Sequence, residues 1–227
     1  MPWADLARFR EGTYHLLSLA FLYPTEERLG AIVETADEML EEGAVLAQFA
    51  FFIQWTQLLY ALNAFGRQEP PRIAQIHLSL FAANPAGVPC PPYESVYREP
   101  TGSATGWLLA QVESAYKTAG LVLAPDVPEL PDHVAVEFGF LAYLCCREAD
   151  AWEAREVEPG VQAVRRQKRF LDRHLAAWFP DFAAQVAVVD SGAAYADLSG
   201  RALAFIKYDS DLLAALLEAP PVVVGAP

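Results

Sequence analysis

Helical periodicity runs through almost the whole chain, and it limits the possible folds more than any other feature of the sequence. Apolar residues recur at intervals of three and four, which places them on one face of an α-helix. The clearest case is the series Ile73, Ile76, His77, Leu80 and Phe81. A convincing alternation of apolar and polar residues, which would indicate a half-buried strand, is absent. The chain is therefore predicted to be all-α, a single-domain bundle of roughly nine or ten helices.

Prolines, glycines and capping residues set the expected helix boundaries. Pro24 should end a first helix, and Thr25 is suited to cap a second one that stops at Gly43. Pro70 and Pro71 should open another helix, because proline is tolerated in a first turn. The remaining helices are expected in an aromatic-rich stretch that ends at Phe65, and around residues 104–119, 133–155, 161–178, 181–189 and 193–218.

Length and composition favour one folded domain with a large core. The chain has 227 residues, of which 54% are hydrophobic, and this composition excludes a disordered protein. We expect the helical bundle to cover residues 1–219. An apolar tail, residues 220–227, follows, and we expect it to lie in a groove of this or a neighbouring molecule.

Several features predict a cytoplasmic protein. No apolar run reaches the ~18 residues that cross a bilayer, and the most apolar stretch, Val134 to Cys146, contains Glu137 and is interpreted as a buried core helix. The N-terminus lacks the apolar segment of a secretory signal. Three cysteines, without any C-x-x-C spacing, argue against a disulfide framework or a zinc site and favour a reducing compartment.

The charge balance is strongly acidic. Sixteen Lys and Arg against 29 Asp and Glu give a net charge of −13, which disfavours nucleic acid and suits a cationic partner. Solubility alone would explain this balance equally well. One basic cluster stands out and is interpreted as a solvated helix face, or as a face for an acidic surface of a partner. It comprises Arg165, Arg166, Lys168, Arg169 and Arg173.

A long proline-rich loop is the first functional clue. It spans the 22 residues 82–103 and contains five prolines, whereas loops of this length inside a compact domain are uncommon and often bind ligands. Its centre carries Tyr93 and Tyr97, which offer a large contact area at low entropic cost. The alternative is a loop that these aromatic residues hold against the protein's own core.

The second clue is a cluster of polar residues at the start of the 133–155 helix. Asp132 is well suited to cap the helix that begins at His133, and His133 and Glu137 are spaced to share one face. Because the rest of that helix is almost wholly apolar, the Glu137 carboxylate needs a partner. Either it bonds a loop backbone or a tyrosine hydroxyl, or the three residues face a pocket; the sequence leaves both open.

These segments together resemble the TorD/DmsD/NarJ family of redox-enzyme maturation chaperones. The resemblance covers most of the chain, and the order of the loop motif and the Pro-Asp-His helix start is its most specific part. The matching pieces are Tyr14, Leu17 and Phe21 with Tyr23-Pro24, then Leu80-Phe81, Pro92 to Tyr97, Tyr116 to Gly120, Pro131-Asp132-His133 with Glu137 and Phe140, and His174-Leu175 with Trp178 before Pro180.

The resemblance implies a helical chaperone without a cofactor or catalytic residues. It would bind the twin-arginine signal peptide or the catalytic subunit of a molybdopterin-dependent oxidoreductase, during cofactor insertion and before export. Some members form domain-swapped dimers, so the resemblance leaves a monomer and a dimer open, with residues 121–131 as the expected hinge. The residues that match the family's peptide groove are His77, Leu80, Phe81, Pro92, Tyr93, Ser95, Tyr97, Asp132 and His133. The chain departs from the family at His77, where an aromatic ring is common.

The chemistry of a twin-arginine peptide indicates how such a groove would work. Carboxylates would bind the guanidinium groups, and we expect Glu94, Asp132 and Glu137 to supply them. Apolar side chains would receive the apolar stretch that follows the arginines. The candidates for these walls are Leu80, Phe81, Tyr93 and Tyr97. The groove is expected where the segment from Phe81 to Tyr97 meets the start of the Asp132 helix.

An enzyme is the main alternative. The set His77, Asp132, His133 and His174 resembles a helical metal-dependent phosphohydrolase, although that family's His-Asp order is reversed here and the chain has only four histidines. His174 is more readily interpreted as a structural histidine. No nucleophile elbow, P-loop or dinucleotide fingerprint is present, so a binding protein is favoured.

Overall fold

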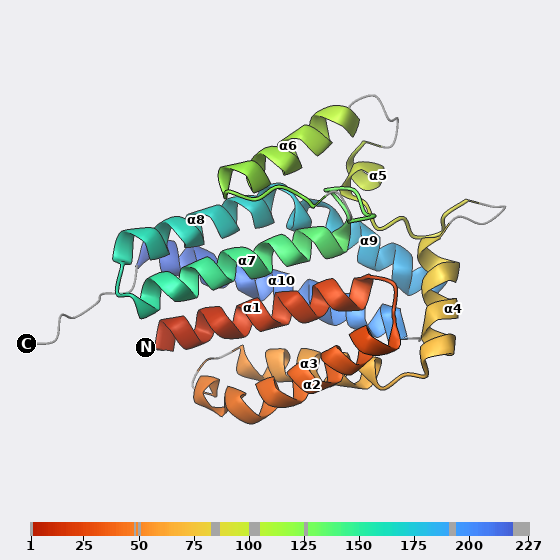
Figure 1. Ribbon diagram of the computed structural model, residues 1–227, viewed down its shortest axis with the longest axis horizontal. Helices are drawn as coiled ribbons and strands as arrows, with labels where there is room; N and C mark the ends of the chain where they lie inside the picture. Colours follow the sequence, from red (N-terminus) through yellow and green to blue (C-terminus); the bar gives the residue numbers. More distant parts are fainter. Residues whose placement is uncertain are drawn as a thin grey trace, which may run out of the picture.

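The computed structural model describes residues 2–47, 49, 51–82, 87–99, 105–124, 127–190 and 194–219. Within these residues the chain forms ten α-helices and one short 3-10 helix, and no named β-strand (Figure 1). The all-α prediction is therefore confirmed. The tail 220–227, Pro85 and Pro100 of the long loop, and residues 125–126 of the expected hinge lie outside the described residues.

The helices follow one another in this order: α1 (Pro2–Phe21), α2 (Glu26–Glu42), the 3-10 helix (Gly43–Leu46), α3 (Phe52–Gly66), α4 (Pro70–Phe81), α5 (Glu94–Arg98), α6 (Thr105–Thr118), α7 (Val134–Glu153), α8 (Val157–Arg173), α9 (Leu175–Val189) and α10 (Ala194–Glu218).

Helices α1 and α7 lie side by side at the centre of the bundle (Figure 1). Helix α8 packs against α7, α10 contacts α3, α8 and α9, and the pair α2–α3 covers one side. Helix α4 stands across one end, and α6 lies outside α7 and α8 (Figure 1). The buried apolar side chains of these helices form one core cluster. None of the described helices is both long and apolar enough to cross a membrane.

Several predicted boundaries are confirmed by local hydrogen bonding. The Thr25 hydroxyl accepts a hydrogen bond from the Arg28 N–H at 3.2 Å, as an N-cap should. Gly43 follows the last residue of α2, and Pro70 opens α4. The apolar stretch from Val134 to Cys146 belongs to α7 and is mostly buried.

Parts of the predicted helix pattern are wrong. The break expected between residues 178 and 181 is absent, because α9 continues through Pro180. The helix expected at 161–178 is divided between α8 and α9, because His174 leaves the helical conformation with φ −120° and ψ −97°. Its buried ring reaches across to Glu94, a contact that the periodicity on either side does not reveal. The proline-rich loop is also not wholly irregular, because it contains α5, which at five residues is too short to show a period.

A buried arginine joins four helices. Arg10 of α1 is fully buried, and its guanidinium group donates to Glu148 of α7 at 2.7 Å, to Gln167 of α8 and to Asp209 of α10. The Tyr14 hydroxyl donates to the same Asp209 at 2.7 Å. A buried charge is tolerated only with such complete pairing. Nothing in the sequence analysis had singled out Arg10.

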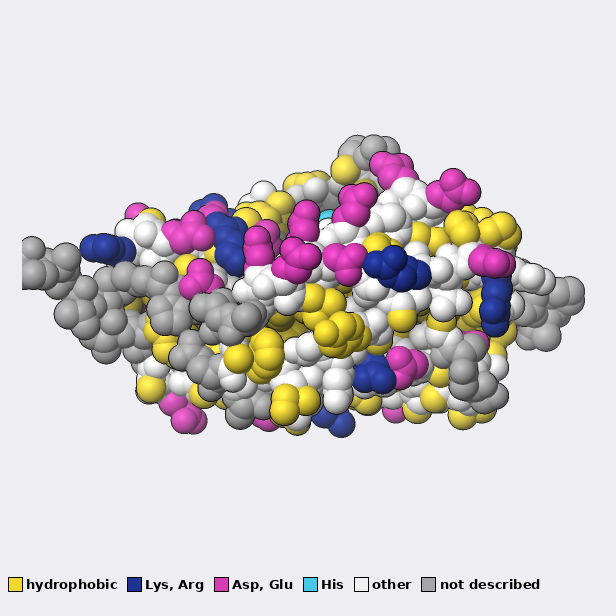
Figure 2. Space-filling view, turned by 90° about the horizontal axis from the view of Figure 1, so that it is seen from below, with side chains coloured by type: hydrophobic (Ala, Val, Ile, Leu, Met, Phe, Trp, Pro, Cys, Tyr) yellow, Lys and Arg dark blue, Asp and Glu magenta, His cyan; other side chains and the backbone are white. Residues whose placement is uncertain are grey.

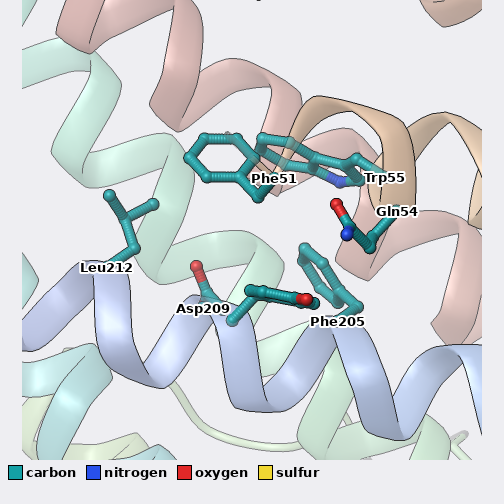
Figure 3. Close-up of a pocket in the computed structure, with 7 residues that line it drawn as sticks. Phe51, Gln54, Trp55, Phe205, Asp209 and Leu212 are labelled. Atoms are coloured by element: carbon teal, nitrogen blue, oxygen red, sulfur yellow. The ribbon is translucent and has the colours of Figure 1, made fainter. Parts of the chain in front are cut away.

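The Asp209 carboxyl also borders a small cavity between α3 and α10. Figure 3 shows Phe51 and Trp55 at the start of α3 and Phe205 and Leu212 of α10 around it. The cavity has a volume of about 20 Å³, room for little more than one water molecule. It is therefore a packing defect next to the buried network, not a site for an organic ligand.

Replacing Arg10 with Met should lower the free energy of unfolding by about 3–5 kcal/mol, because it leaves two buried carboxylates without their cation. Urea denaturation measures this change. Arg8→Met is the matched control. Arg8 lies on the same helix as Arg10 but is partly exposed, and so are its acidic partners. It should cost about 1 kcal/mol or less. Equal losses in the two variants would contradict a special role for Arg10.

Candidate functional site

The proline-rich loop and the start of α7 lie against each other, as the sequence analysis expected. Tyr93 and His133 form an isolated antiparallel bridge. The Glu94 N–H donates to the Asp132 carbonyl at 3.0 Å, and the Val134 N–H donates to the Pro92 carbonyl at 2.9 Å. These backbone bonds fix the position of α5 relative to α7. We call this region the α5–α7 junction.

Asp132 does not have the role that the sequence suggested, and His133 takes it instead. The Asp132 carboxylate does not cap α7; its Oδ2 accepts from the Ser95 N–H at 2.9 Å, in the first turn of α5. The cap of α7 is His133, whose Nδ1 accepts from the Ala135 N–H at 3.1 Å. Because the first N–H groups of both helices need acceptors, two adjacent capping side chains serve two different helices.

The His133 ring is buried beside Tyr93. The two ring centroids lie 5.0 Å apart, with the rings edge to face. Burial lowers the pKa of His133 to about 4, so the neutral imidazole that accepts the capping hydrogen bond persists at neutral pH. The Tyr93 hydroxyl donates to Glu129 at 2.8 Å, and this carboxylate lies 3.7 Å from His133 Nε2.

Two buried glutamates face each other behind the α5–α7 junction. Glu94 Oε2 lies 2.9 Å from His174 Nδ1, and Glu94 Oε1 accepts from Arg98. Glu137 Oε2 accepts from the Trp178 indole N–H at 3.1 Å. Burial, followed by the neighbouring Glu94 carboxylate, raises the pKa of Glu137 well above its ordinary range. The Glu137 carboxyl group is therefore disposed to hold a proton.

The expected partners of Glu137 differ from the observed one. Among the described residues, neither a loop backbone nor a tyrosine hydroxyl bonds this carboxyl group; the indole of Trp178 on α9 does. His133 and Glu137 also do not act together, because the His133 ring turns back to the α7 N-terminus. His174 is held by Glu94 and by contact with the Phe170 ring, as expected of a structural histidine.

Phe81 and Tyr97 of the predicted groove are joined through Phe182 in one network of aromatic contacts, whereas Tyr93 contacts His133. His77 lies edge-on to Phe81 at 5.0 Å and to Tyr23 at 5.7 Å between ring centroids. Tyr97 lies over Trp178 at 5.5 Å. Of the predicted residues, Leu80, Phe81, Pro92, Glu94, Ser95, Asp132, His133 and Glu137 are buried, whereas His77, Tyr93 and Tyr97 are half-buried.

Buried polar atoms without hydrogen-bond partners concentrate in this region. Eight such side-chain atoms occur among the described residues, and four of them are His77 Nδ1, Tyr97 OH, Asp132 Oδ1 and Glu137 Oε1. A fifth, the hydroxyl of Tyr195, belongs to a ring that packs against both His77 and Phe81. Because native proteins leave few buried polar groups unpaired, this concentration marks unused hydrogen-bonding capacity.

The metal-dependent alternative gains no support from this geometry. Within the described part of the chain, no group of three or more His, Cys, Asp or Glu side chains is placed to hold a metal ion. Asp132 accepts a backbone hydrogen bond, and His174 is bonded to Glu94. The set His77, Asp132, His133 and His174 therefore does not converge on a common point.

Comparison with known proteins identifies the family. Residues 33–184 match the family model described as nitrate reductase delta subunit. The chain belongs to this family. The chain is also similar to curated proteins named TorD, which confirms the resemblance that the loop and the Asp132 helix had indicated.

Curated relatives of this delta subunit family member are named as chaperones. It is 41% identical over 85 residues to the selenate reductase assembly chaperone protein of Thauera selenatis, covering 37% of this chain and 42% of that one. It is 31% identical over 123 residues to the chaperone protein TorD of Vibrio atlanticus, covering 54% and 56%. It is 42% identical over 76 residues to the chlorate reductase assembly chaperone protein of Ideonella dechloratans, covering 33% and 38%. The matches thus span about half the length of these relatives or less.

A solved structure shares the fold. The chain superimposes with a TM-score of 0.51 on a protein from Archaeoglobus fulgidus described as a redox enzyme maturation protein, covering 90% of this chain and 93% of that one at 24% identity. At this level of identity the likeness establishes the helical fold alone.

Replacing Glu137 with Gln should remove a pH dependence of stability. The folded state holds the Glu137 proton more tightly than the unfolded chain, in which the pKa is about 4.3. As pH rises from that value, wild-type stability should fall by up to about 1.4 kcal/mol per pH unit until the folded carboxyl group ionises. Glutamine has no such proton and keeps the acceptor for Trp178, so the advantage of E137Q should grow with pH.

Thermal unfolding across a pH series tests this expectation. The exposed residue Glu42 at the end of α2 supplies the control E42Q, which should follow the wild-type curve. A constant difference between E137Q and wild type at every pH would show that Glu137 is not protonated in the folded protein.

Proposed function

We propose that this protein is an assembly chaperone for a molybdopterin-dependent oxidoreductase. In the cytoplasm it binds the catalytic subunit, its twin-arginine signal peptide, or both, during cofactor insertion and before export. The family match and the reductase chaperones among the relatives support a reductase as the partner. The relatives are named as chaperones and not as enzymes, which supports a protein that binds and does not catalyse.

The observation that carries the peptide proposal is the unused polar capacity at the α5–α7 junction. Asp132 and Glu137 each keep one buried oxygen without a hydrogen-bond partner beside Glu94, and an arriving guanidinium group would displace the proton that Glu137 holds. One guanidinium group already lies here, because Arg98 donates to Glu94 and to the Arg173 carbonyl at 2.7 Å. The junction is therefore chemically suited to arginine.

Access to these acids requires α5 to move, because Glu94, Asp132 and Glu137 are completely buried. Helix α5 has only five residues, and the polar bonds that hold it are those of Asp132, the contact of Arg98 with the Arg173 carbonyl and the contact of Glu94 with His174. We infer that a peptide arginine takes the place of Arg98 as α5 shifts. The charge of the peptide offsets the cost of exposing the carboxylates, since charged hydrogen bonds are the strong ones.

The apolar stretch of a signal peptide has a matching surface nearby. In this proposal the buried Leu80 and Phe81 would form the inner wall once α5 has shifted, and the half-buried Tyr93 and Tyr97 would form the outer one. Tyr23 and Leu78 are 46% and 49% exposed beside His77, so apolar area is already available there.

The charge of the surface suits a cationic peptide. Figure 2 shows a band of acidic side chains, with few Lys or Arg, over the side that α2 and α3 cover. Helix α2 alone carries seven acidic residues against Arg28, which are Glu26, Glu27, Glu34, Asp37, Glu38, Glu41 and Glu42. Such a field raises the rate at which a cationic segment reaches the protein.

The variant D132N/E137Q should bind a twin-arginine signal peptide about tenfold more weakly or worse than wild type, and its affinity should depend less on salt. Both substitutions keep the shape and the acceptor oxygen used by Ser95 or Trp178. Calorimetric titration measures the affinity. A peptide with lysines in place of the two arginines should bind wild type more weakly, because lysine lacks the guanidinium fork.

The matched control is D197N/E158Q, which removes one Asp and one Glu charge from exposed positions in α10 and α8. It should retain the wild-type affinity, apart from a small loss of long-range attraction. If D132N/E137Q binds as tightly as this control, the carboxylates of the junction do not contact the peptide arginines.

A further inference from the structure

A second concave region lies between α6 and α8, outside all the residues predicted to bind the peptide. It is a cavity of about 230 Å³. Arg166, Arg169 and Arg173 line it from α8, and Phe140 and Phe170 line it from α7 and α8, with their ring centroids 4.7 Å apart. The cavity thus combines a cationic wall with an aromatic floor.

The three arginines share one face of α8, because their spacing of three and four residues brings them into line along the helix. None of them forms an ion pair with any described residue. Elsewhere on the same helix, Arg165 pairs with Glu158 and Lys168 pairs with Asp172. Among the basic residues of α8, the ones without an ion pair to a described residue are therefore those that line the cavity.

The charge of the cavity lining is opposite in sign to the net charge of the chain. The chain carries 29 Asp and Glu against 16 Lys and Arg, yet no Asp or Glu lines this cavity. Three positive charges along one face of α8 repel one another, and an anion bound among them would relieve this repulsion. Glu94 contacts His174, which lines the cavity, and its carboxylate is already held by His174 and by Arg98.

The α6 wall adds neutral donors. Gln111 Nε2 is buried and has no hydrogen-bond partner, and Gln111 lines the cavity. Ser114 and Thr118 follow on the same helix, three and seven residues later, and line it as well. Guanidinium, amide and hydroxyl donors therefore approach one space from two helices, and such convergent donors are typical of oxyanion sites.

We propose that this cavity binds a phosphate-bearing small molecule. Arginine forks match the oxygens of a phosphate group bidentately, and the Gln111 amide would supply the donor that currently has no acceptor. The cavity is bounded by two helices and an aromatic floor, so it suits a compact ligand better than an extended acidic chain. Inorganic phosphate and phosphate esters share this chemistry, and an ester would also contact the floor with its organic part.

Calorimetric titration of the full chain with pyrophosphate and with glycerol phosphate tests the proposal, at an ionic strength where the Debye length is about 8 Å. Saturable binding at one site per chain is expected. In R166Q/R169Q the affinity should fall about tenfold or more. In R166K/R169K it should fall less, because the charge remains while the fork is lost.

The matched control is R72Q/R155Q. Arg72 and Arg155 are exposed, form no side-chain ion pair with a described residue, and lie away from this cavity, so the control removes the same charge. Its affinity should stay within about twofold of wild type.

Three results would overturn the proposal. They are the absence of saturable binding of either compound, an equal loss of affinity in R166Q/R169Q and in the control R72Q/R155Q, and tighter binding of a hexaglutamate peptide than of pyrophosphate. The last result would show that the arginines receive an acidic polypeptide. The Gln111→Ala variant tests the α6 wall without a change in charge. Unchanged affinity in this variant would show that the Gln111 amide does not contact the ligand. Because the peptide titration uses other residues, either proposal can fail without the other.

Discussion

A guanidinium group without access to water holds the centre of this protein together. Arg10 cannot be buried without compensation, so Glu148, Gln167 and Asp209 must meet it, and each comes from a different helix. This requirement fixes α7, α8 and α10 around α1. The α5–α7 junction and the arginine-lined cavity both depend on this arrangement of helices, because α7 begins at the junction and α8 carries the three arginines of the cavity.

The parts of the fold that follow from local chemistry were predictable from the sequence. Thr25 before an amphipathic run, or Pro70 at the start of one, determines a helix end through nearby backbone groups. The role of Arg10 was not predictable in this way. Its partners lie 138 to 199 residues further along the chain, and a single arginine in an amphipathic helix resembles a surface residue.

For the candidate site, the sequence predicted which segments meet but not how their side chains pair. The family resemblance placed the proline-rich loop beside the Asp132 helix, and the backbone bonds between Pro92 and Val134 bear out that meeting. The pairing differed because Asp132 and His133 can both cap a helix, and only the position of α5 decides between them. Trp178 was likewise hidden as the partner of Glu137, since α9 is placed by the break at His174.

The pairing of Arg10 with Asp209 also has a consequence for the order of folding. These residues are separated by 199 positions, so their bond closes one of the longest loops that the chain contains. Long-range contacts form late because loop closure costs entropy. During synthesis α1 emerges well before α10, because 199 positions separate Arg10 from its counter-ion Asp209. The N-terminal part must therefore remain incompletely packed until α10 arrives, and the bundle closes only then.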